Sequence, residues 1–167
     1  MMLQTSIRPY MPDDWPVVRR IYTEGIATGM ATFDTKPKSR SAWESDSIPG
    51  SQIVAVDEQG NILAWALLWP ASNRCVYRGV AEVSIYVSED ARGKGVGRRT
   101  LEALIVTSEK LGIWTLQAGI MSDNHASVKL HEQCEFRVIG TREKLAKLQN
   151  VWLDVIFMER RSQRIGT

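Results

Sequence analysis

The chain has 167 residues, which is the length of one domain and enough to bury a core without disulfides or structural metals, so we expect a single domain over residues 1–167. An apolar fraction of 44% and a charged fraction of 24% are ordinary for a globular protein, and a net charge of +2 is too small to argue on its own for nucleic-acid binding. The two cysteines, Cys75 and Cys134, form no metal or redox motif, and neither a signal peptide nor a membrane span is visible, so we expect a cytoplasmic protein.

The first part of the chain predicts one strand and two helices. Residues 7–10 favour a short strand, and the proline–aspartate turn at 12–14 starts a helix that runs to about residue 28, with an aspartate as its cap. A shorter helix is expected over 41–47, capped by Ser39 or Ser41. Val17, Val18, Ile21 and Tyr22 line one face of the first helix, and Trp43 is the expected anchor of the second.

A hairpin and a long loop follow. Residues 52–56 and 62–69 read as two strands, because they are rich in apolar and β-branched residues, and the segment 58–61 between them is a hairpin turn. The segment 70–79 is expected to be an irregular loop. It carries Arg74, Tyr77 and Arg78.

The centre of the chain is a strand, a glycine-rich loop and a helix. Residues 83–87 are β-branched or aromatic in the manner of a strand, and the segment 92–98 that follows has three glycines within five residues. Apolar residues at Leu101, Leu104, Ile105 and Leu111 then predict a helix that ends near residues 110–112. A glycine loop that enters a helix N-terminus offers free amides and a positive dipole end, so a phosphate-bearing ligand is expected there.

The last part of the chain completes an α+β fold. Residues 114–120 predict a strand, and 122–124 cap a helix that ends at about residue 133. Two further strands are expected over 136–143 and 151–159, before a loose tail over 163–167. Because antiparallel strands run together before the last two helices, the class is α+β.

The glycine-rich loop matches neither of two common phosphate-binding motifs. It lacks the closing Gly-Lys-Ser/Thr of a Walker loop and the G-x-G-x-x-G spacing of a dinucleotide-binding turn. The pattern Arg92-x-x-Gly95-x-Gly97 after a strand instead resembles the acetyl-CoA pyrophosphate loop of the Gcn5-related N-acetyltransferase (GNAT) superfamily. That resemblance implies a mixed, mostly antiparallel sheet of six or seven strands with about four helices, splayed where acetyl-CoA binds.

A second motif supports the same resemblance. The stretch from Asn124 to Phe136 resembles the superfamily pattern Asn-x-x-Ala/Ser-x-x-Leu-Tyr/His-x-x-x-Gly-Phe, except that Glu135 stands where glycine is usual. Asn124 would cap its helix and also bond the pantetheine arm of the cofactor. The residues that the resemblance assigns to acetyl-CoA are Ile85, Tyr86, Val87, Arg92, Gly93, Lys94, Gly95, Val96, Gly97, Arg98 and Asn124.

Four separated segments narrow the resemblance to one group of acetyltransferases. They are the segments around Phe33, Ala81–Val87, Leu130–Glu132 and Val151–Val155. In this order they resemble phosphinothricin N-acetyltransferases and their relatives that acetylate methionine sulfoximine and methionine sulfone. The resemblance also implies a homodimer.

Glu82 is the candidate general base. An amine must lose a proton before it attacks a thioester, and a carboxylate can take that proton directly or through water. Strand alternation places Glu82, Ser84 and Tyr86 on one face of the strand. The alternative is that Glu82 forms a structural salt bridge with Arg74 or Arg78, which does not exclude catalysis.

His131 is the second candidate catalytic residue. It falls where many members of the resembled family carry the tyrosine that protonates the leaving thiolate, and histidine can act as acid or base near neutral pH. The alternatives are a cofactor contact or a buried helix histidine bonded to a carbonyl. No metal site is expected, because His125 and His131 are six positions apart and point in different directions on a helix.

The substrate site is assigned by the resemblance. Arg74 and Tyr77 align with positions that hold the substrate, and an arginine suits an amino acid carboxylate because it grips it with two parallel hydrogen bonds. The full set of expected substrate contacts is Phe33, Ser72, Arg74, Tyr77, Glu82 and Ser84.

The sequence therefore predicts an acetyl-CoA-dependent N-acetyltransferase that acts by direct transfer on the α-amine of a small amino acid analogue, without a metal, nucleic acid or membrane partner. One alternative is another amine, such as a peptide N-terminus or a polyamine. The second alternative is a non-catalytic acetyl-CoA sensor.

Overall fold

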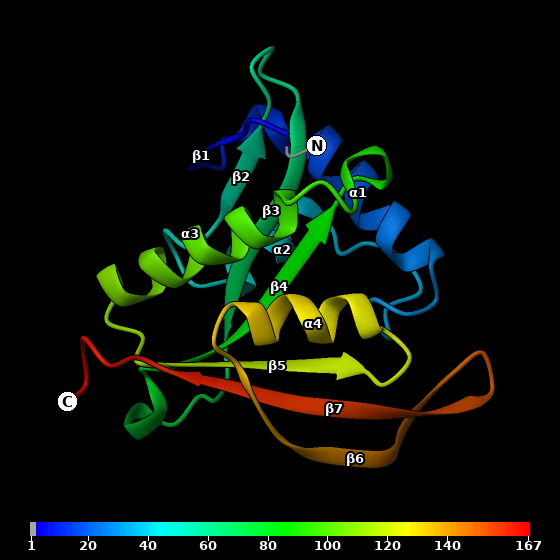
Figure 1. The fold of residues 1–167 in the computed structure, drawn as a ribbon, viewed down its shortest axis with the longest axis vertical. Coiled ribbons are helices and arrows are strands. Elements are labelled where there is room, and N and C mark those ends of the chain that lie inside the picture. Colours follow the sequence, from blue (N-terminus) through cyan, green and yellow to red (C-terminus); the bar gives the residue numbers. More distant parts are fainter. Residues whose placement is uncertain (1–2) are drawn as a thin grey trace.

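The computed structural model describes residues 3–167 and contains one seven-stranded sheet with helices on both faces (Figure 1). The strands are β1 (Ser6–Pro9), β2 (Ile53–Val56), β3 (Ile62–Pro70), β4 (Val80–Val87), β5 (Thr115–Met121), β6 (Arg137–Leu148) and β7 (Val151–Arg161). The α-helices are α1 (Trp15–Ala27), α2 (Arg40–Asp46), α3 (Val96–Lys110) and α4 (His125–Gln133), with short 3-10 turns at Pro12–Asp14, Cys75–Tyr77 and Glu89–Ala91. The predicted α+β class, strand number and helix number are confirmed.

The sheet opens between its two middle strands. The strand order is β1-β2-β3-β4-β5-β7-β6, and every neighbouring pair is antiparallel except β4 and β5, which are parallel. These two strands pair only from Val80 to Glu82 against Thr115 to Gln117. Figure 1 shows them starting side by side and separating toward their C-terminal ends. The predicted splay is therefore present.

Strand alternation divides the core between the two faces of the sheet. On one face Val83 packs with Leu101 and Leu104 of α3. On the other face Trp43 of α2 and Trp65 of β3 are fully or almost fully buried, and they pack with α1. Burial of such large aromatic side chains contributes strongly to stability. The two faces of β4 are consequently anchored on different helices.

Several local predictions are confirmed and others are wrong. Ser39 caps α2 by accepting from the Ala42 amide, as predicted. Asp14 does not cap α1, because its carboxylate is taken by Arg8 at 2.7 Å and by the Met11 amide. Leu111 is not part of the buried face of α3. It follows the last helical residue and is 39% exposed.

The strands also differ from their predicted bounds. β4 begins at Val80, earlier than the predicted residue 83, because Val80 pairs with Thr115 of β5 and Ala81 pairs with Pro70 of β3. β6 continues to Leu148 instead of ending near residue 143, and it has irregular register at two places. Within residues 3–167, no helix combines the length and apolar character that crossing a bilayer requires.

Candidate active site

The glycine-rich loop presents backbone amides at the N-terminus of α3. Gly93 and Gly95 adopt positive φ angles of 73° and 82°, which glycine tolerates without the strain of a side chain. The first amides of a helix have no partner inside the helix, so those of Val96, Gly97 and Arg98 face outward. Together with the helix dipole they form a site that suits an anionic phosphate group.

A groove of about 530 Å³ runs from this loop to α4, and we call it the loop groove. Gly97 keeps it narrow but open, because a Cβ there would lie 3.3 Å from Leu130 and 3.4 Å from Val87. The lining residues are Ile85, Val87, Arg92, Gly93, Gly95, Gly97, Arg98, Asn124, Ala126, Ser127, Lys129, Leu130 and Gln133. Eight of the eleven residues predicted to bind acetyl-CoA are among them.

The remaining predicted contacts lie next to the groove. Tyr86 lies on β4 between two lining residues, and Val96 is buried at the start of α3. Lys94 bends back, so that its ammonium donates to the Asp90 carbonyl at 2.7 Å. Arg92 likewise donates to the Val87 carbonyl at 3.2 Å. These two bonds tie the loop to the strand that precedes it.

The β4 edge that faces the splay offers further backbone groups. β4 pairs with β3 from Ala81 to Val87 but with β5 only up to Glu82. The N–H and C=O groups of the last β4 residues that point toward β5 are therefore free of strand partners. Such an edge can hydrogen-bond an extended ligand in the place of a strand.

A second, smaller hollow of about 180 Å³ lies in the splay, and we call it the Glu82 hollow. Its side chains come from the α1–α2 connection, β4 and α4, and its floor from β5. Its polar and aromatic lining residues are Thr32, Phe33, Glu82, Ser84, Tyr86, Ser127 and His131. Because Ile85 and Ser127 line both hollows, the loop groove and the Glu82 hollow meet at these two residues.

Glu82 lies on the exposed side of β4 with its carboxylate uncommitted. The predicted alternative of a salt bridge to Arg74 or Arg78 is not formed, and within residues 3–167 this carboxylate has no hydrogen-bond or ion-pair partner. Desolvation raises the pKa of Glu82, and the positive charge of Arg142 opposes this shift. A carboxylate with a raised pKa is a stronger proton acceptor, as a general base requires.

His131 is buried in α4 and held in one tautomer. Its Nδ1 lies 2.7 Å from the Ser127 carbonyl oxygen, which can only accept, so Nδ1 carries the hydrogen. Burial lowers the pKa of His131, and its ring also meets Phe136 edge-on with centroids 5.0 Å apart. At neutral pH the ring is therefore uncharged and Nε2 is a proton acceptor.

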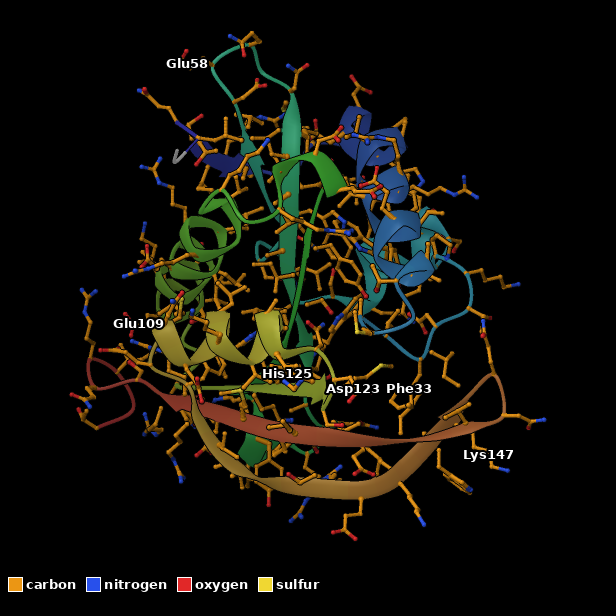
Figure 2. All side chains as sticks on the ribbon, turned by 45° about the vertical axis from the view of Figure 1, so that its right-hand side comes forward. Phe33, Glu58, Glu109, Asp123, His125 and Lys147 are labelled. Atoms are coloured by element: carbon orange, nitrogen blue, oxygen red, sulfur yellow. The ribbon has the colours of Figure 1, made fainter. Side chains whose placement is uncertain are left out.

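The α1–α2 connection reaches across to the start of α4. The Asn124 side chain donates from Nδ2 to the Met30 carbonyl at 3.2 Å and accepts at Oδ1 from the Ser127 amide, which confirms its predicted role as a helix cap. Figure 2 shows Phe33 on this connection near Asp123 and His125 at the beginning of α4. The connection thus closes one side of the Glu82 hollow.

Packing fixes the two other β4 side chains in the hollow. The Ser84 hydroxyl accepts from Nε1 of Trp69 at 2.8 Å. Tyr86 stacks on Trp65 at 4.6 Å and fills the space that a side chain at Gly25 would need. These contacts hold the Ser84 and Tyr86 side chains in place on the side of β4 that faces the hollow.

Three of the predicted substrate residues lie elsewhere. Ser72, Arg74 and Tyr77 belong to the β3–β4 connection and line neither hollow. The Ser72 hydroxyl accepts from the Arg74 amide at 3.2 Å, and the Arg74 guanidinium lies 5.3 Å from the centre of the Tyr77 ring. Their substrate role stays a prediction from the resemblance.

Arg142 was not predicted as a residue of the site, because no motif or periodicity marks it. This residue belongs to β6, and its guanidinium lies 4.9 Å from the centre of the Phe157 ring. Its position near Glu82 depends on how β6 pairs with β7 around two register shifts, which no local pattern reveals. Among residues 3–167, no group of three histidine, cysteine or acidic residues is placed to hold a metal.

Comparisons with known proteins agree with this geometry. Residues 14–136 match the model of the acetyltransferase (GNAT) family. The chain is 32% identical to the L-methionine sulfoximine/L-methionine sulfone acetyltransferase of Pseudomonas paraeruginosa, with 94% of each chain covered. It is 31% identical to the phosphinothricin N-acetyltransferase of Alcaligenes faecalis, covering 93% of this chain and 81% of the relative.

The fold is likewise that of solved acetyltransferases. The structure of a phosphinothricin acetyltransferase from Sinorhizobium meliloti in complex with acetyl-CoA superposes with a TM-score of 0.88 and 30% identity, covering 98% of this chain and 91% of that one. The predicted sheet, splay and helix arrangement are therefore shared with a protein that binds acetyl-CoA.

Proposed function

The chain belongs to the acetyltransferase (GNAT) family, and from this premise we propose that it transfers an acetyl group from acetyl-CoA to the α-amine of a small amino acid of the methionine sulfoximine, methionine sulfone or phosphinothricin type. The observation that carries the proposal is the junction of the two hollows at Ile85 and Ser127. An acyl donor in the loop groove and an amine in the Glu82 hollow would meet there.

The residues of the loop groove fit acetyl-CoA. The amides at the start of α3 suit its pyrophosphate, and the free edge of β4 suits its extended pantetheine arm. Gly97 leaves room where a side chain would press on Val87 and Leu130. When bound, acetyl-CoA supplies an activated acetyl thioester.

Glu82 prepares the amine for attack. An α-ammonium group has a pKa of about 8, so at neutral pH most of it must lose a proton before it can react. Glu82 takes this proton, directly or through water, and its raised pKa suits the task. The neutral nitrogen then bonds to the acetyl carbon while the carbon–sulfur bond breaks and the thiolate leaves.

His131 can protonate the departing thiolate only after its own ring has gained a proton. At rest its Nδ1–H is engaged by the Ser127 carbonyl and its Nε2 carries no proton. We assign it the role of a relay, which accepts a proton released during turnover and returns it to the sulfur. A backbone N–H near Ile85 and Tyr86 stabilises the oxyanion.

Direct transfer is favoured over an acyl-enzyme. Neither cysteine lines either hollow, since Cys75 is exposed on the β3–β4 connection and Cys134 is buried at the C-terminal end of α4. Burial raises the pKa of the Cys134 thiol to about 11, which makes it a poor nucleophile at neutral pH.

A small substrate fits the size of the Glu82 hollow. Its volume of about 180 Å³ is below the range of roughly 300–1,000 Å³ that is usual for drug-sized ligands. This size favours a single amino acid over an aminoglycoside or a folded protein surface.

We also propose a homodimer. Five large apolar side chains on β6 and β7 are between 45% and 59% exposed, namely Val138, Ile139, Leu145, Val151 and Trp152. Scattered exposed side chains are normal, but a concentration on one hairpin is typical of an interaction surface. Light scattering during size-exclusion chromatography tests this, and a monomer at all concentrations would contradict it.

The function is tested by measuring free-thiol release from acetyl-CoA with a panel of amines. We expect turnover with L-methionine sulfoximine, L-methionine sulfone or phosphinothricin and little with spermidine, an aminoglycoside or a peptide N-terminus. Turnover only with the last three would retain the acetyltransferase and reject the substrate class. Tight acetyl-CoA binding without turnover of any amine would favour a sensor.

A further inference from the structure

Arg142 is a cation whose charge acts on Glu82, and no acidic side chain within residues 3–167 pairs with it. It is exposed on β6, and within residues 3–167 its guanidinium forms no ion pair and no hydrogen bond. Its one close contact of note is the face of Phe157, 4.9 Å from the ring centre. A guanidinium held on an aromatic face keeps its N–H donors available at its edge.

The register of the sheet connects this arginine to the hollow. Phe157 of β7 is the direct partner of Gly119 in β5, and Gly119 lines the Glu82 hollow. Gly119 contributes no side chain, and one there would lie 3.3 Å from Val155. β5 therefore presents no side chain at the position that lies between Phe157 and the Glu82 hollow.

Glu82 and Arg142 offer one negative and one positive charge, which complement the ammonium and the carboxylate of an α-amino acid. An α-amino acid carries its ammonium and its carboxylate on the same carbon, so its two charges are close but opposite. The positive charge of Arg142 is near enough to lower the pKa of Glu82, yet the two side chains form no ion pair. A ligand with both charges would bridge this gap.

We propose that Arg142 binds the carboxylate of the amino acid whose amine faces Glu82, and so selects α-amino acids over amines without a carboxylate. This inference rests on the proposed function and adds a residue of β6 to the substrate site. The guanidinium fork suits a carboxylate because two parallel N–H donors match its two oxygens. Spermidine offers no such group, so it gains nothing from Arg142.

Two other cations are less suited to this role. Arg74, the residue that the sequence resemblance favours, lies over Tyr77 on the β3–β4 connection and is not among the charges that shift the pKa of Glu82. The Lys38 ammonium lies 5.6 Å from the centre of the Trp69 ring, and Lys38 is likewise not among the charges that shift the pKa of Glu82. Of these three cations, Arg142 alone combines proximity to Glu82 with a free guanidinium.

The test compares two substrates that differ in charge, L-methionine sulfone and its methyl ester, with wild type and Arg142→Gln. Loss of a charge-assisted pair costs roughly 1.5–3 kcal/mol, so we expect kcat/KM for the acid to fall on the order of 10- to 100-fold. For the ester, which has no carboxylate, kcat/KM should change less than about 3-fold. Arg142→Lys should retain part of the preference for the acid.

The matched control is Arg137→Gln, which removes another exposed arginine from the same strand. Arg137 pairs with Glu159 at 2.8 Å and lies in neither hollow, so both substrates should be turned over at wild-type rates. The KM for acetyl-CoA and the thermal midpoint of each variant report whether the fold is intact.

The possible outcomes separate this inference from the proposed function. Equal losses for acid and ester in Arg142→Gln, or no loss for either, would overturn the carboxylate role while the enzyme still acetylates amino acids. A selective loss for the acid in Arg74→Gln alone would return the role to Arg74. If wild type acetylates spermidine or a peptide but no amino acid, the proposed function fails, and the inference fails with it.

Discussion

The two hollows that meet at Ile85 and Ser127 differ in the groups that line them. The loop groove is lined at one end by three glycines and offers backbone amides and a free strand edge. The Glu82 hollow is lined by side chains that several distant elements contribute. One region recognises its ligand mostly through the main chain, and the other mostly through side chains.

This difference explains how one fold can keep the same acyl donor, acetyl-CoA, while the amine that accepts the acetyl group changes. Backbone N–H groups are present whichever side chains the loop carries. The loop groove therefore suits a ligand that stays the same. The Glu82 hollow is lined by side chains such as Phe33, Ser84 and His131, which substitutions change directly. Substitutions in the two regions should therefore separate donor binding from acceptor chemistry.

The largest effect should come from Glu82→Gln, which breaks the acceptor side alone. The amide keeps the size of the side chain but cannot take a proton, so we expect kcat to fall on the order of 10²- to 10³-fold at neutral pH. The KM for acetyl-CoA should stay within about 2-fold, because Glu82 does not line the loop groove. Steady-state thiol-release kinetics check both values. A large rise in the KM for acetyl-CoA would show that the two hollows are not separable.

Gly95→Ala should break the donor side alone. Gly95 has φ of 82° at the start of α3, where a Cβ costs roughly 1–2 kcal/mol. If this strain falls on the loop geometry that binds the pyrophosphate, the KM for acetyl-CoA should rise on the order of 10-fold. The rise should be the same with every amine, which competition kinetics with two different amines can measure. A rise that depends on the amine would contradict the division.

His131 should make the stability of the protein depend on pH. Burial lowers the pKa of His131 in the folded state, so below its ordinary value of 6.5 the unfolded chain binds the proton more readily. The free energy of unfolding is then constant above about pH 6.5 and falls as the pH drops below this value. The total loss is about 1.4 kcal/mol for each unit by which the pKa differs between the folded and unfolded states. Urea unfolding from about pH 5 to pH 8 should show this slope in wild type and a smaller one in His131→Gln. Equal slopes would mean that His131 is not the group that titrates.

The smallest effect should come from Ser84→Ala, which tests whether a second residue of the Glu82 hollow contacts the amine. It removes the acceptor of the Trp69 Nε1 hydrogen bond, at a cost of about 1 kcal/mol in unfolding free energy. The KM for the amine should rise a few-fold, on the order of 2- to 5-fold, while the KM for acetyl-CoA should not change. Denaturant unfolding and initial-rate kinetics measure the two effects. An unchanged KM for the amine would remove Ser84 from the substrate surface.

The parts of the molecule that the sequence predicts well are those that depend on neighbours in the chain. The glycine loop, the caps at Ser39 and Asn124 and the alternation along β4 are all local, and all are present. The Asp14 cap fails because a residue from another element, Arg8, takes the carboxylate. Competition of this kind cannot be read from propensity.

The substrate side is predicted less well for the same reason. Arg142 reaches the neighbourhood of Glu82 through the pairing of β6 with β7, which shifts register between Val138 and Gly140 and again after Arg142. One residue of slip would turn Arg142 to the other face of the sheet. Arg74, by contrast, lies on a connection whose path no periodicity describes, and it lines neither hollow.

The most direct test of the account is the ratio of wild-type to Glu82→Gln turnover as a function of pH, with L-methionine sulfone as the amine and saturating acetyl-CoA. If Glu82 removes the proton from the substrate ammonium, the ratio should be large near neutral pH and should shrink as the pH rises above the amine's own pKa of about 8, because the amine then needs no base. A ratio that stays constant across this range, or a variant as active as wild type at neutral pH, would contradict the role of Glu82 and the mechanism built on it.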